Sequence, residues 1–416
     1  MPRYLVIQLA RFGDVVQTKR LVRTLCLRGE THVCVDRGLR PLASILYPEA
    51  VVHPLPAHGN MDASAMESVH ATLRELAALP FDAVYNCNYS GLNHALARLF
   101  PTEIVRGYRM RGPQPLRDAW VSLAFRWTSQ RRIAPINLVD FWAYFDRHPC
   151  DPTETCAPAR GQGRGLGVVL AGRESRRSLP PPVLARCLHT AFEALNGPPV
   201  FFLGSAAERP LGRQLLRQLP GHMVDRVQDL SGKTDWAGLM DALTGLDAVL
   251  TPDTGTMHLA AHLGVPVQAF FLSSAWCHET GPYGSGHTVW QGVGECAPCL
   301  EAGGCGSGTA CLRAFESRGL LRGLADSLQG NPPAGRLPED LAQFASHVDA
   351  LGSTWRLVAG QDTAEPRRTA LRQLVAEYLH VPLTGQTPRD AALECALADF
   401  FYDEAQWMLP EDAHEC

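Results

Sequence analysis

Short apolar runs alternate with amphipathic runs along this chain, and that alternation constrains the fold more than any other feature. Residues 4–9 (YLVIQL) predict a buried strand, residues 15–27 carry apolar side chains at helical spacing, and residues 32–35 predict another strand. Strands that are apolar throughout are typical of parallel sheets with helices on both faces. We therefore predict that the first part of the chain is a doubly wound α/β domain.

The same pattern starts again after residues 147–165, a stretch rich in proline, glycine and cysteine that we interpret as a linker. Residues 167–170 (GVVL) predict the first strand of a second doubly wound domain. The predicted division is a domain over residues 1–150, a domain over residues 164–325 and a helical extension over residues 326–416. Two such domains face each other across a cleft at the carboxyl ends of their strands, where ligands bind in these folds.

Composition limits the classes of partner. With 46% hydrophobic and 19% charged residues, the 416-residue chain is typical of a folded globular protein. Its net charge of -4 argues against nucleic acid as a partner. The sequence has no signal-peptide pattern and no apolar run of the roughly 20 residues that a membrane helix needs, so we expect a cytoplasmic protein.

The stretch TPDTGTMHLAAHLGVPV, residues 251–267, places small polar groups between a predicted strand and a predicted helix. Asp253 or Thr254 is suited to cap that helix, and Gly255 permits close approach to the backbone. His258 lies in the first turn. The plainer alternative is a capping side chain and a buried histidine, but an anionic ligand explains the whole set, because helix-start amides attract anions.

Two further turns of this domain carry groups that suit a nucleotide. In VVLAGRESRRSLP, Gly172 permits a tight turn, and the guanidinium groups of Arg176 and Arg177 are suited to a phosphate. In FFLGSAAERP, Glu208 follows a strand, where its carboxylate can accept hydrogen bonds from ribose hydroxyls. Surface arginines and a helix-start acid are the alternative interpretations. Three such turns from one sheet predict a pocket for a nucleotide diphosphate.

The first domain presents one candidate catalytic acid. In VIQLARFGDVVQT, Asp14 lies between a strand and a helix, and an ionised aspartate facing the cleft is suited to act as a general base. Helix capping is the alternative role. Asp36 follows the second strand, where a dehydrogenase carries its ribose-binding acid, but the G-x-G-x-x-G fingerprint is absent. A nucleotide-dependent oxidoreductase is therefore the weaker alternative.

Four of the thirteen cysteines, Cys296, Cys299, Cys305 and Cys311, form a C-x2-C-x5-C-x5-C pattern. Four thiols spaced by glycine and proline are suited to a structural zinc or iron ion. One alternative is a loop of reduced thiols beside the nucleotide pocket. Another is a non-catalytic scaffold that binds a partner through this loop.

Residues 98–132 are rich in arginine and indicate an anionic partner for the first domain. The segment RGYRMRG supplies Arg106, Arg109 and Arg111 as candidate contacts to that partner. The following segment, residues 118–132, mixes aromatic side chains with arginines. Such a run is suited to a membrane surface, although a half-buried helix has the same composition.

Taken together, the motifs resemble glycosyltransferase family 9, the ADP-heptose lipopolysaccharide heptosyltransferases. The matching segments are LARFGDVVQT, FDAVYNCNYS, RGYRMRG, LSGKTDWAGLMDAL, TPDTGTMHLAAHLGVPVQAFF, GPYG and CAPC, in order over roughly residues 3–315. The resemblance implies a GT-B fold, two Rossmann-like domains facing a cleft, with the donor held by the second. It also implies inverting transfer from a nucleotide-activated sugar, usually ADP-heptose, with no metal cofactor required for the transfer.

Roles carried over from the family fall on matching positions. The resemblance makes Asp14 the catalytic base, Glu208 the acid that binds the nucleoside, and Asp253 the residue that holds the sugar hydroxyls. The other expected donor-binding residues are Gly172, Arg176, Arg177, Thr254, Gly255 and His258. The sequence departs from the family where it reads RRSLP, with Arg177 in the place of a lysine and Leu179 in the place of a tryptophan.

The resemblance leaves the acceptor open. The family's usual acceptors are anionic core sugars on lipid A, which Arg106, Arg109 and Arg111 would suit. This implies peripheral contact with the cytoplasmic face of the inner membrane. Because the tail from about residue 331 lies outside the resemblance, a protein or another glycan is the alternative acceptor.

Overall fold

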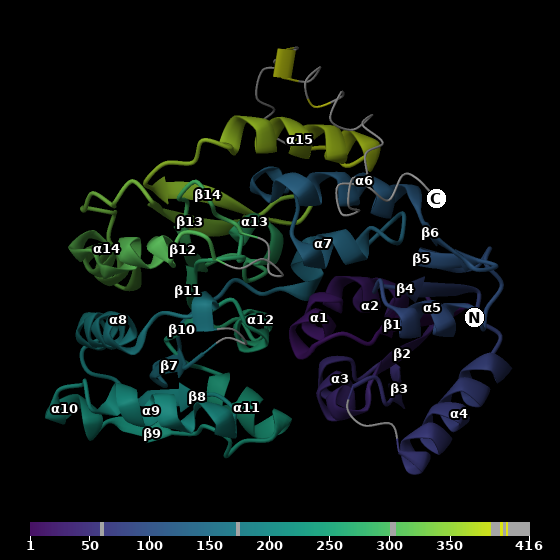
Figure 1. The fold of residues 1–416 in the computed structure, drawn as a ribbon, viewed down its shortest axis with the longest axis horizontal. Helices are drawn as coiled ribbons and strands as arrows, with labels where there is room; N and C mark the ends of the chain where they lie inside the picture. The colour runs from purple at the N-terminus through teal and green to yellow at the C-terminus, as the bar shows by residue number, and fades with distance from the viewer. Residues whose placement is uncertain (59–61, 172–174, 300–304, 384–391, 394–396, 398–416) are drawn as a thin grey trace.

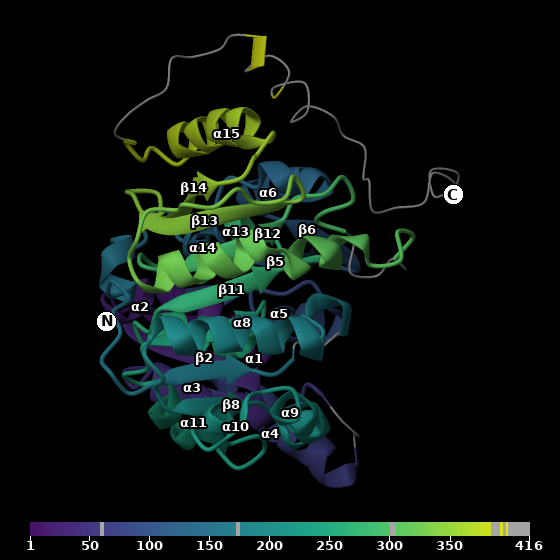
Figure 2. The same ribbon diagram turned by 90° about the vertical axis from the view of Figure 1, so that its left-hand side faces the viewer.

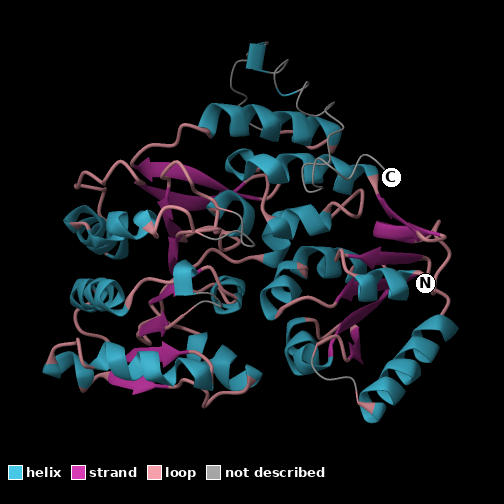
Figure 3. Ribbon diagram, in the orientation of Figure 1, coloured by secondary structure: helices cyan, strands magenta, loops and turns pink. Residues whose placement is uncertain are grey.

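The computed structural model describes residues 1–58, 62–171, 175–299, 305–383, 392–393 and 397. Figure 1 shows two α/β halves side by side, the first in purple and blue and the second in teal and green. In each half a central sheet is flanked by helices, as the colouring by secondary structure in Figure 3 makes clear. The prediction of two doubly wound α/β domains that face each other is confirmed.

The first sheet has the strand order β3-β2-β1-β4-β5-β6, in which all neighbours are parallel except β5 and β6. Its strands are β1 (Arg3–Gln8), β2 (Glu30–Asp36), β3 (Val51–Leu55), β4 (Ala83–Asn86), β5 (Val105–Arg111) and β6 (Gln114–Arg117). The central strand β1 is apolar, and its last four residues are buried, because helices cover both faces of the sheet.

The second sheet has the strand order β14-β13-β12-β11-β10-β7-β8-β9. Its strands are β7 (Leu166–Val169), β8 (Val200–Leu203), β9 (Val227–Asp229), β10 (Ala248–Pro252), β11 (Val267–Phe271), β12 (Thr288–Gly292), β13 (Leu341–Val348) and β14 (Ser353–Ala359). All five residues of β10 are buried. The pairs formed by β13 are antiparallel, so the hairpin of β13 and β14 extends a parallel sheet.

This hairpin corrects the prediction of a helical extension over residues 326–416, which is wrong for the two strands. Strand β13 lies between β12 and β14, and four of its first five residues are buried while the fifth is partly exposed. Its apolar residues therefore do not alternate with polar ones, and the alternation that predicts a strand is missing. The rest of the predicted extension includes the end of one helix and the whole of another within the described residues. The tail segments beyond residue 383 lie mostly outside the described residues.

The helices connect the strands and cover the sheets. Those of the first half are α1 (Phe12–Gln17), α2 (Lys19–Cys26), α3 (Arg40–Leu46), α4 (Ala63–Ala78), α5 (Gly91–Ala97), α6 (Ala119–Trp127) and α7 (Leu138–Ala143). Those of the second are α8 (Pro181–Ala194), α9 (Arg209–Leu216), α10 (Gly221–Val224), α11 (Trp236–Leu243), α12 (Gly255–His262), α13 (Cys277–Thr280), α14 (Arg318–Leu328) and α15 (Glu365–Tyr378). Short 3-10 helices are η1 (Arg37–Leu39), η2 (Thr128–Ile133), η3 (Pro152–Thr155), η4 (Ser175–Arg177), η5 (Ala206–Glu208) and η6 (Ala310–Glu316).

Helix α15 returns to the first half of the molecule. Figures 1 and 2 both place it at the top, next to α6. Arg372 on α15 donates to the carbonyl of Pro135 at 2.6 Å, and Tyr378 stacks on Trp120 with ring centroids 6.2 Å apart. Helix α15 therefore packs on the domain that contains the first strand of the chain.

The aromatic run of residues 118–132 contains helix α6, and this helix is half-buried. The structure therefore agrees with the second interpretation of that run, a half-buried helix, rather than with a helix on a membrane surface. Trp120 and Trp127 are both buried, so they face the core. Within the part of the chain that the structure describes, no helix is both long enough and apolar enough to span a bilayer.

A buried ion pair within the first half makes hydrogen bonds that connect it to the second half. Arg20 on α2 donates from Nη1 to Asp140 Oδ1 on α7 at 2.7 Å and to the carbonyl of Leu351 at 3.0 Å. The Tyr283 hydroxyl donates to the same Asp140 oxygen at 2.7 Å, and the backbone N–H of Ser353 donates to the other at 3.0 Å. The carboxylate therefore connects α2 and α7 to the loop before β12 and to the β13–β14 turn.

Replacing Arg20 by alanine is expected to lower the free energy of unfolding by about 3–5 kcal/mol, because Asp140 would remain buried without its cation. Chemical denaturation measures this change. The matched control is Arg23→Ala on the same helix, since Arg23 pairs with Glu49 at 2.9 Å with side chains 38% and 61% exposed. That change is expected to cost about 0–1 kcal/mol. Equal losses in the two variants would contradict the role given to the buried pair.

Candidate active site

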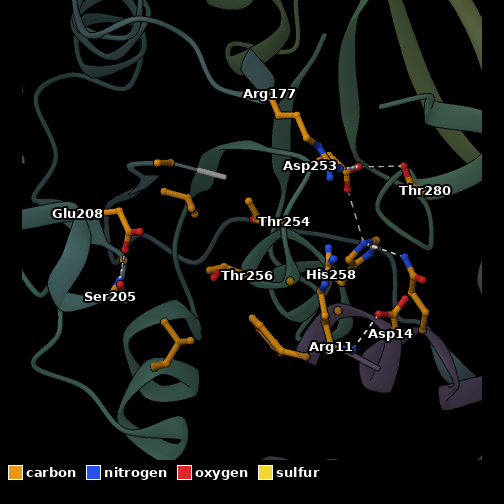
Figure 4. Close-up of a pocket in the computed structure, with 18 of the residues that line it drawn as sticks. Arg11, Asp14, Arg177, Ser205, Glu208, Asp253, Thr254, Thr256, His258 and Thr280 are labelled. Atoms are coloured by element: carbon orange, nitrogen blue, oxygen red, sulfur yellow. Dashed lines mark hydrogen bonds and ion pairs between the residues drawn. The ribbon is translucent and has the colours of Figure 1, made fainter. Parts of the chain in front are cut away.

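A cavity of about 800 Å³ lies between the two domains and is called the main cavity below. The first domain contributes the start of α1, and the second contributes the turns that follow β7, β8 and β10. Figure 4 shows the lining side chains, with Glu208 and Ser205 on one side of this view and Arg11 and Asp14 on the other. Since the carboxyl ends of parallel strands meet at one edge of each sheet, the two domains present these edges to one another.

The turn after β10 forms the part of the lining between these two sides. The Thr254 hydroxyl accepts a hydrogen bond from the Met257 N–H at 3.3 Å, so Thr254 is the N-cap of α12. Asp253, the other predicted cap, does not cap the helix; its carboxylate contacts the side chains of Arg177 and Thr280. Gly255 and Thr256 begin α12 and line the cavity. The first amides of a helix have no partner within the helix, so the start of α12 is suited to an anion.

Asp253 is buried between two partners from other elements. Arg177 on η4 forms an ion pair with Asp253 Oδ2, and the Thr280 hydroxyl at the end of α13 donates to the same oxygen at 3.2 Å. Burial raises the pKa of Asp253, while the Arg177 guanidinium and the Thr280 hydrogen bond oppose that rise. The pair presents a cation and an anion side by side at the edge of the cavity.

His258 is neutral in this environment. Its ring is buried, and this burial, with the charges of Lys19 and Arg177, lowers the pKa of His258 to about 3. Its Nε2 lies 2.8 Å from Gln17 Nε2 on α1, and 3.8 Å from Asp253 Oδ1. The histidine therefore links the two domains by a hydrogen bond and adds no positive charge at neutral pH.

Asp14 lies in the first turn of α1, half-buried, and lines the main cavity. Its Oδ2 accepts a hydrogen bond from the backbone N–H of Arg11 at 3.0 Å. The N-cap of α1 is Arg11, so Asp14 is not the N-cap that the sequence offered as an alternative role; as the third helical residue it accepts from the N-cap backbone. The structure shows the contact together with a place at the cavity, so capping and a role in the cavity are compatible.

Glu208 also combines two roles. One carboxylate oxygen accepts a hydrogen bond from the Ser205 N–H at 2.5 Å, which closes a capping box at η5. Both residues line the main cavity together with Gly204. The capping contact holds the carboxylate at the cavity's far side from Asp14 in Figure 4.

Two glycines, Gly13 on α1 and Gly255 on α12, allow the two domains to contact each other closely. A Cβ atom on Gly255 would lie 2.2 Å from Phe12 Cδ1, and one on Gly13 would lie 3.3 Å from the Gly255 Cα. The Phe12 ring in turn packs against Trp236 of α11 with ring centroids 4.9 Å apart. Only residues without side chains allow α1 and α12 to approach this closely.

Some predicted residues are not brought to the main cavity. Gly172 lies outside the described residues. Arg176 is described but does not line the cavity, unlike its neighbour Arg177. The candidate acceptor contacts Arg106, Arg109 and Arg111 are on β5, and none of them lines the cavity. Arg109 pairs with Asp118 at 2.8 Å.

The four clustered cysteines lie near one another but do not form a closed ligand set. Cys299 Sγ lies 3.2 Å from the Ser273 hydroxyl, and Cys296 and Cys305 are exposed. Among the described residues, the group of potential ligands that converges within 4.8 Å is His189, Glu193 and His222, all exposed. The zinc or iron site at the cysteines therefore stays a prediction.

The main cavity includes residues that the sequence did not indicate. Gln17 and Thr280 bind His258 and Asp253, and Phe12 and Trp236 form the aromatic contact at the domain junction. Arg131, within the arginine-rich segment, also lines the cavity and pairs with Glu279. Gln17 lies within the segment LARFGDVVQT, but the motif assigned it no role, and Thr280 lies outside the quoted segments. Only their distance in space from the predicted residues reveals them.

Comparison with known proteins relates the second domain to one family. The model of glycosyltransferase family 9 (heptosyltransferase) matches residues 192–305. Lipooligosaccharide heptosyltransferase 2 of Haemophilus influenzae is 33% identical over 76 residues, which are 18% of this chain and 22% of that protein. The matched segment thus spans about a fifth of the curated relative.

Solved structures extend the likeness to both domains. The glycosyltransferase family 9 protein of Veillonella parvula has a TM-score of 0.56 and 16% identity, covering 70% of this chain and 87% of that one. Escherichia coli heptosyltransferase WaaC with ADP has a TM-score of 0.53 and 17% identity, covering 70% and 93%. E. coli ADP-heptose lps heptosyltransferase II has a TM-score of 0.50 and 19% identity, covering 69% and 89%. At these identities the likeness shows the shared fold.

Substituting Gly255 by alanine is expected to destabilise the protein by about 1–3 kcal/mol, because the added methyl would displace the Phe12 ring. Thermal and chemical denaturation measure the loss. Gly91→Ala at the start of α5 is the matched control, since no atom lies within 4 Å of its added Cβ. If both variants unfolded like the wild type, the close contact between α1 and α12 would be refuted.

Acidification is expected to destabilise the protein partly through His258. Its pKa is about 3 when folded and about 6.5 when unfolded, so the unfolded state takes up the proton first as pH falls below about 6.5. This one group then costs about 1.4 kcal/mol per pH unit until its folded pKa is reached. Denaturation of wild type and His258→Asn at pH 7.5 and 5 measures the difference. The variant should lose less stability than the wild type, and an equal loss would contradict the assignment.

Proposed function

We propose that the chain acts as a member of glycosyltransferase family 9, whose model matches residues 192–305, and that it transfers a sugar, heptose from ADP-heptose, onto an anionic glycan acceptor. The single observation that supports the proposal is the composition of the main cavity. One wall presents the carboxylate of Asp14, and the other presents the start of α12 beside Arg177 and Asp253. A base and an anion site on opposite domains are what a transfer between two substrates requires.

The donor binds to the second domain in this proposal. Its diphosphate lies at the start of α12, where backbone amides and the nearby Arg177 guanidinium offset the phosphate charge. Glu208 accepts hydrogen bonds from the ribose hydroxyls, and Asp253 from the sugar hydroxyls. One relative of this fold was solved with ADP, which supports an adenine nucleotide as the donor's leaving part.

The transfer is a displacement at the anomeric carbon. The acceptor oxygen forms a bond to that carbon as its proton passes to the Asp14 carboxylate, and the bond from the carbon to the ADP oxygen breaks. The electron pair of that bond leaves with ADP, so negative charge grows on the diphosphate. The amides of α12 and the Arg177 guanidinium stabilise this charge without any metal ion. Attack from the side opposite ADP inverts the configuration.

For the acceptor we propose the lipopolysaccharide core, by analogy with the relatives whose names carry that substrate. A protein or a different glycan is the alternative acceptor. Arg11 and Arg131 are first-domain cations that line the main cavity, so they are better placed than Arg106, Arg109 and Arg111 to meet an anionic group there. An acceptor on lipid A would place the enzyme at the cytoplasmic face of the inner membrane.

Replacing Asp14 by asparagine is expected to lower turnover by at least about 100-fold and to leave ADP affinity nearly unchanged, because only proton transfer is lost. Turnover is measured with a panel of nucleotide sugars and core acceptors, and ADP binding by calorimetry. The control Glu67→Gln alters an exposed acid on α4, outside the main cavity. Asp14→Asn activity of a tenth or more of wild type would contradict the assignment of the base. Absence of transfer from every donor would contradict the proposed function.

A further inference from the structure

Three side chains that are able to bind a metal ion converge on the outer side of the second domain. His189 and Glu193 lie on α8, and His222 lies on α10. One ligand atom of each residue lies within 4.8 Å of the other two, and all three residues are exposed. Figure 1 places α8 and α10 on the side of the second half that faces away from the first. None of the three residues lines the main cavity, so the cluster is separate from the proposed transfer site.

The geometry of α8 puts two of the three ligands side by side. Residues four apart in an α-helix are neighbours on its surface, as His189 and Glu193 are. Zinc enzymes use the same spacing, because two histidines four residues apart on one helix hold a single ion. Leu188 and Phe192, which precede the two ligands, are buried in the core. This burial fixes the rotation of α8 and leaves His189 and Glu193 on its exposed face.

The third ligand comes from a short helix that is anchored to the core. Met223, next to His222 on α10, is fully buried and belongs to the same core cluster as Phe192. The His222 ring packs against the Phe192 ring, with ring centroids 6.0 Å apart. This contact holds the imidazole beside the end of α8, near Glu193. Packing of the core therefore brings together ligands from two segments that are not adjacent in the sequence.

The distances within the cluster fit a shared ion better than direct hydrogen bonds. Nε2 of His189 lies 3.6 Å, and Nε2 of His222 lies 3.5 Å, from the same oxygen, Oε1 of Glu193. A hydrogen bond places N and O about 2.7–3.2 Å apart, so both contacts are too long for good hydrogen bonds. Ligands about 2.0–2.1 Å from a tetrahedral zinc ion lie roughly 3.3 Å from one another. The two observed distances need to shorten by only a few tenths of an ångström, and the exposed imidazoles are able to rotate toward each other.

The charge of the cluster also favours a cation. Among the residues that the structure describes, Glu193 has no lysine or arginine partner. Two arginines of the same region donate elsewhere, Arg186 on α8 to the carbonyl of Glu316 at 2.6 Å and Arg226 to the carbonyl of Gly197 at 3.2 Å. Imidazoles that bind a metal are neutral, so the cluster then carries one negative charge. A divalent cation offsets that charge.

We propose that His189, Glu193 and His222 bind a zinc ion. Imidazole nitrogen and carboxylate oxygen are both zinc ligands, and a set of three protein ligands leaves the fourth tetrahedral position to water. The ion links α8 to α10 and stabilises the folded chain, because the unfolded chain does not hold the three ligands together. The proposal does not rest on sugar transfer, so an inactive enzyme still tests it. It is also independent of the metal site predicted at the cysteines.

The test is the amount of zinc bound per chain, measured on the full protein by equilibrium dialysis over a series of free zinc concentrations. The double variant His189→Ala/His222→Ala is expected to bind about one ion fewer than the wild type. The matched control His70→Ala/His148→Ala removes two exposed imidazoles from the first domain and should bind as much zinc as the wild type. Zinc held by the cysteines contributes equally to all three proteins, so it cancels in the difference. Equal binding by the three proteins would overturn the proposal.

A second measurement locates the ion. Diethyl pyrocarbonate modifies accessible imidazoles, and mass spectrometry of peptides gives the rate at each histidine. Zinc is expected to slow the modification of His189 and His222 at least about tenfold, because a nitrogen bound to the metal does not react, and to leave exposed His70 unchanged. Glu193→Gln keeps the shape of the side chain but removes its charge, so this protection should weaken. Unchanged rates in the wild type, or full protection in Glu193→Gln, would contradict the site.

Discussion

The arrangement of the site depends on one buried constraint, the contact of Arg20 with Asp140. The two side chains are 2% and 0% exposed and lie on different helices, α2 and α7. Tyr283 and the backbone of Leu351 and Ser353 complete the hydrogen bonds, so segments far apart in sequence meet at one carboxylate. A buried pair of this kind contributes little net stability, because desolvation offsets attraction, but it specifies one geometry. That geometry holds α2, which follows directly after α1, the helix that carries Asp14.

Glycines at the domain junction add a steric constraint to this electrostatic one. Gly352 lies in the β13–β14 turn, where a Cβ atom would be 2.0 Å from Asp140 Oδ2, and its φ of +147° is rarely adopted by other residues. Gly255 serves the same purpose beneath Phe12. Backbone without side chains therefore occurs at two of the places where one domain contacts the other. The result is that a carboxylate from one domain and a helix start from the other line the same cavity.

The electrostatics of the main cavity are nearly balanced before any substrate enters. Arg177 and Asp253 neutralise one another, and buried His258 is uncharged at neutral pH. The attraction for a diphosphate then comes mainly from the backbone amides at the start of α12. Arg177 adds to it when its guanidinium contacts the phosphate as well as Asp253. Such preorganised dipoles need no reorganisation as charge develops.

The sequence determined the two α/β domains. Its predicted strands are apolar throughout, without alternation of polar and apolar residues, and such strands need helices on both faces of their sheet. It also determined that Asp14, Glu208, Asp253 and Thr254 follow strand ends, and the structure places all four at one cavity. Local pattern reveals such residues because turn chemistry is local. It was silent where partners are distant, as for Gln17 with His258, separated by 241 residues.

Tertiary structure alone decided three further matters. It showed that β13 and β14 belong to the second sheet. This pairing depends on contact with β12, which the sequence of residues 341–359 alone does not reveal. It distinguished Arg177, which reaches Asp253, from Arg176, which does not line the cavity. It also buried the Lys19 ammonium, which makes no hydrogen bond to the residues that the structure describes. Each is a property of packing in three dimensions, where burial and the identity of neighbours change the energy of a charge, and no local pattern carries that information.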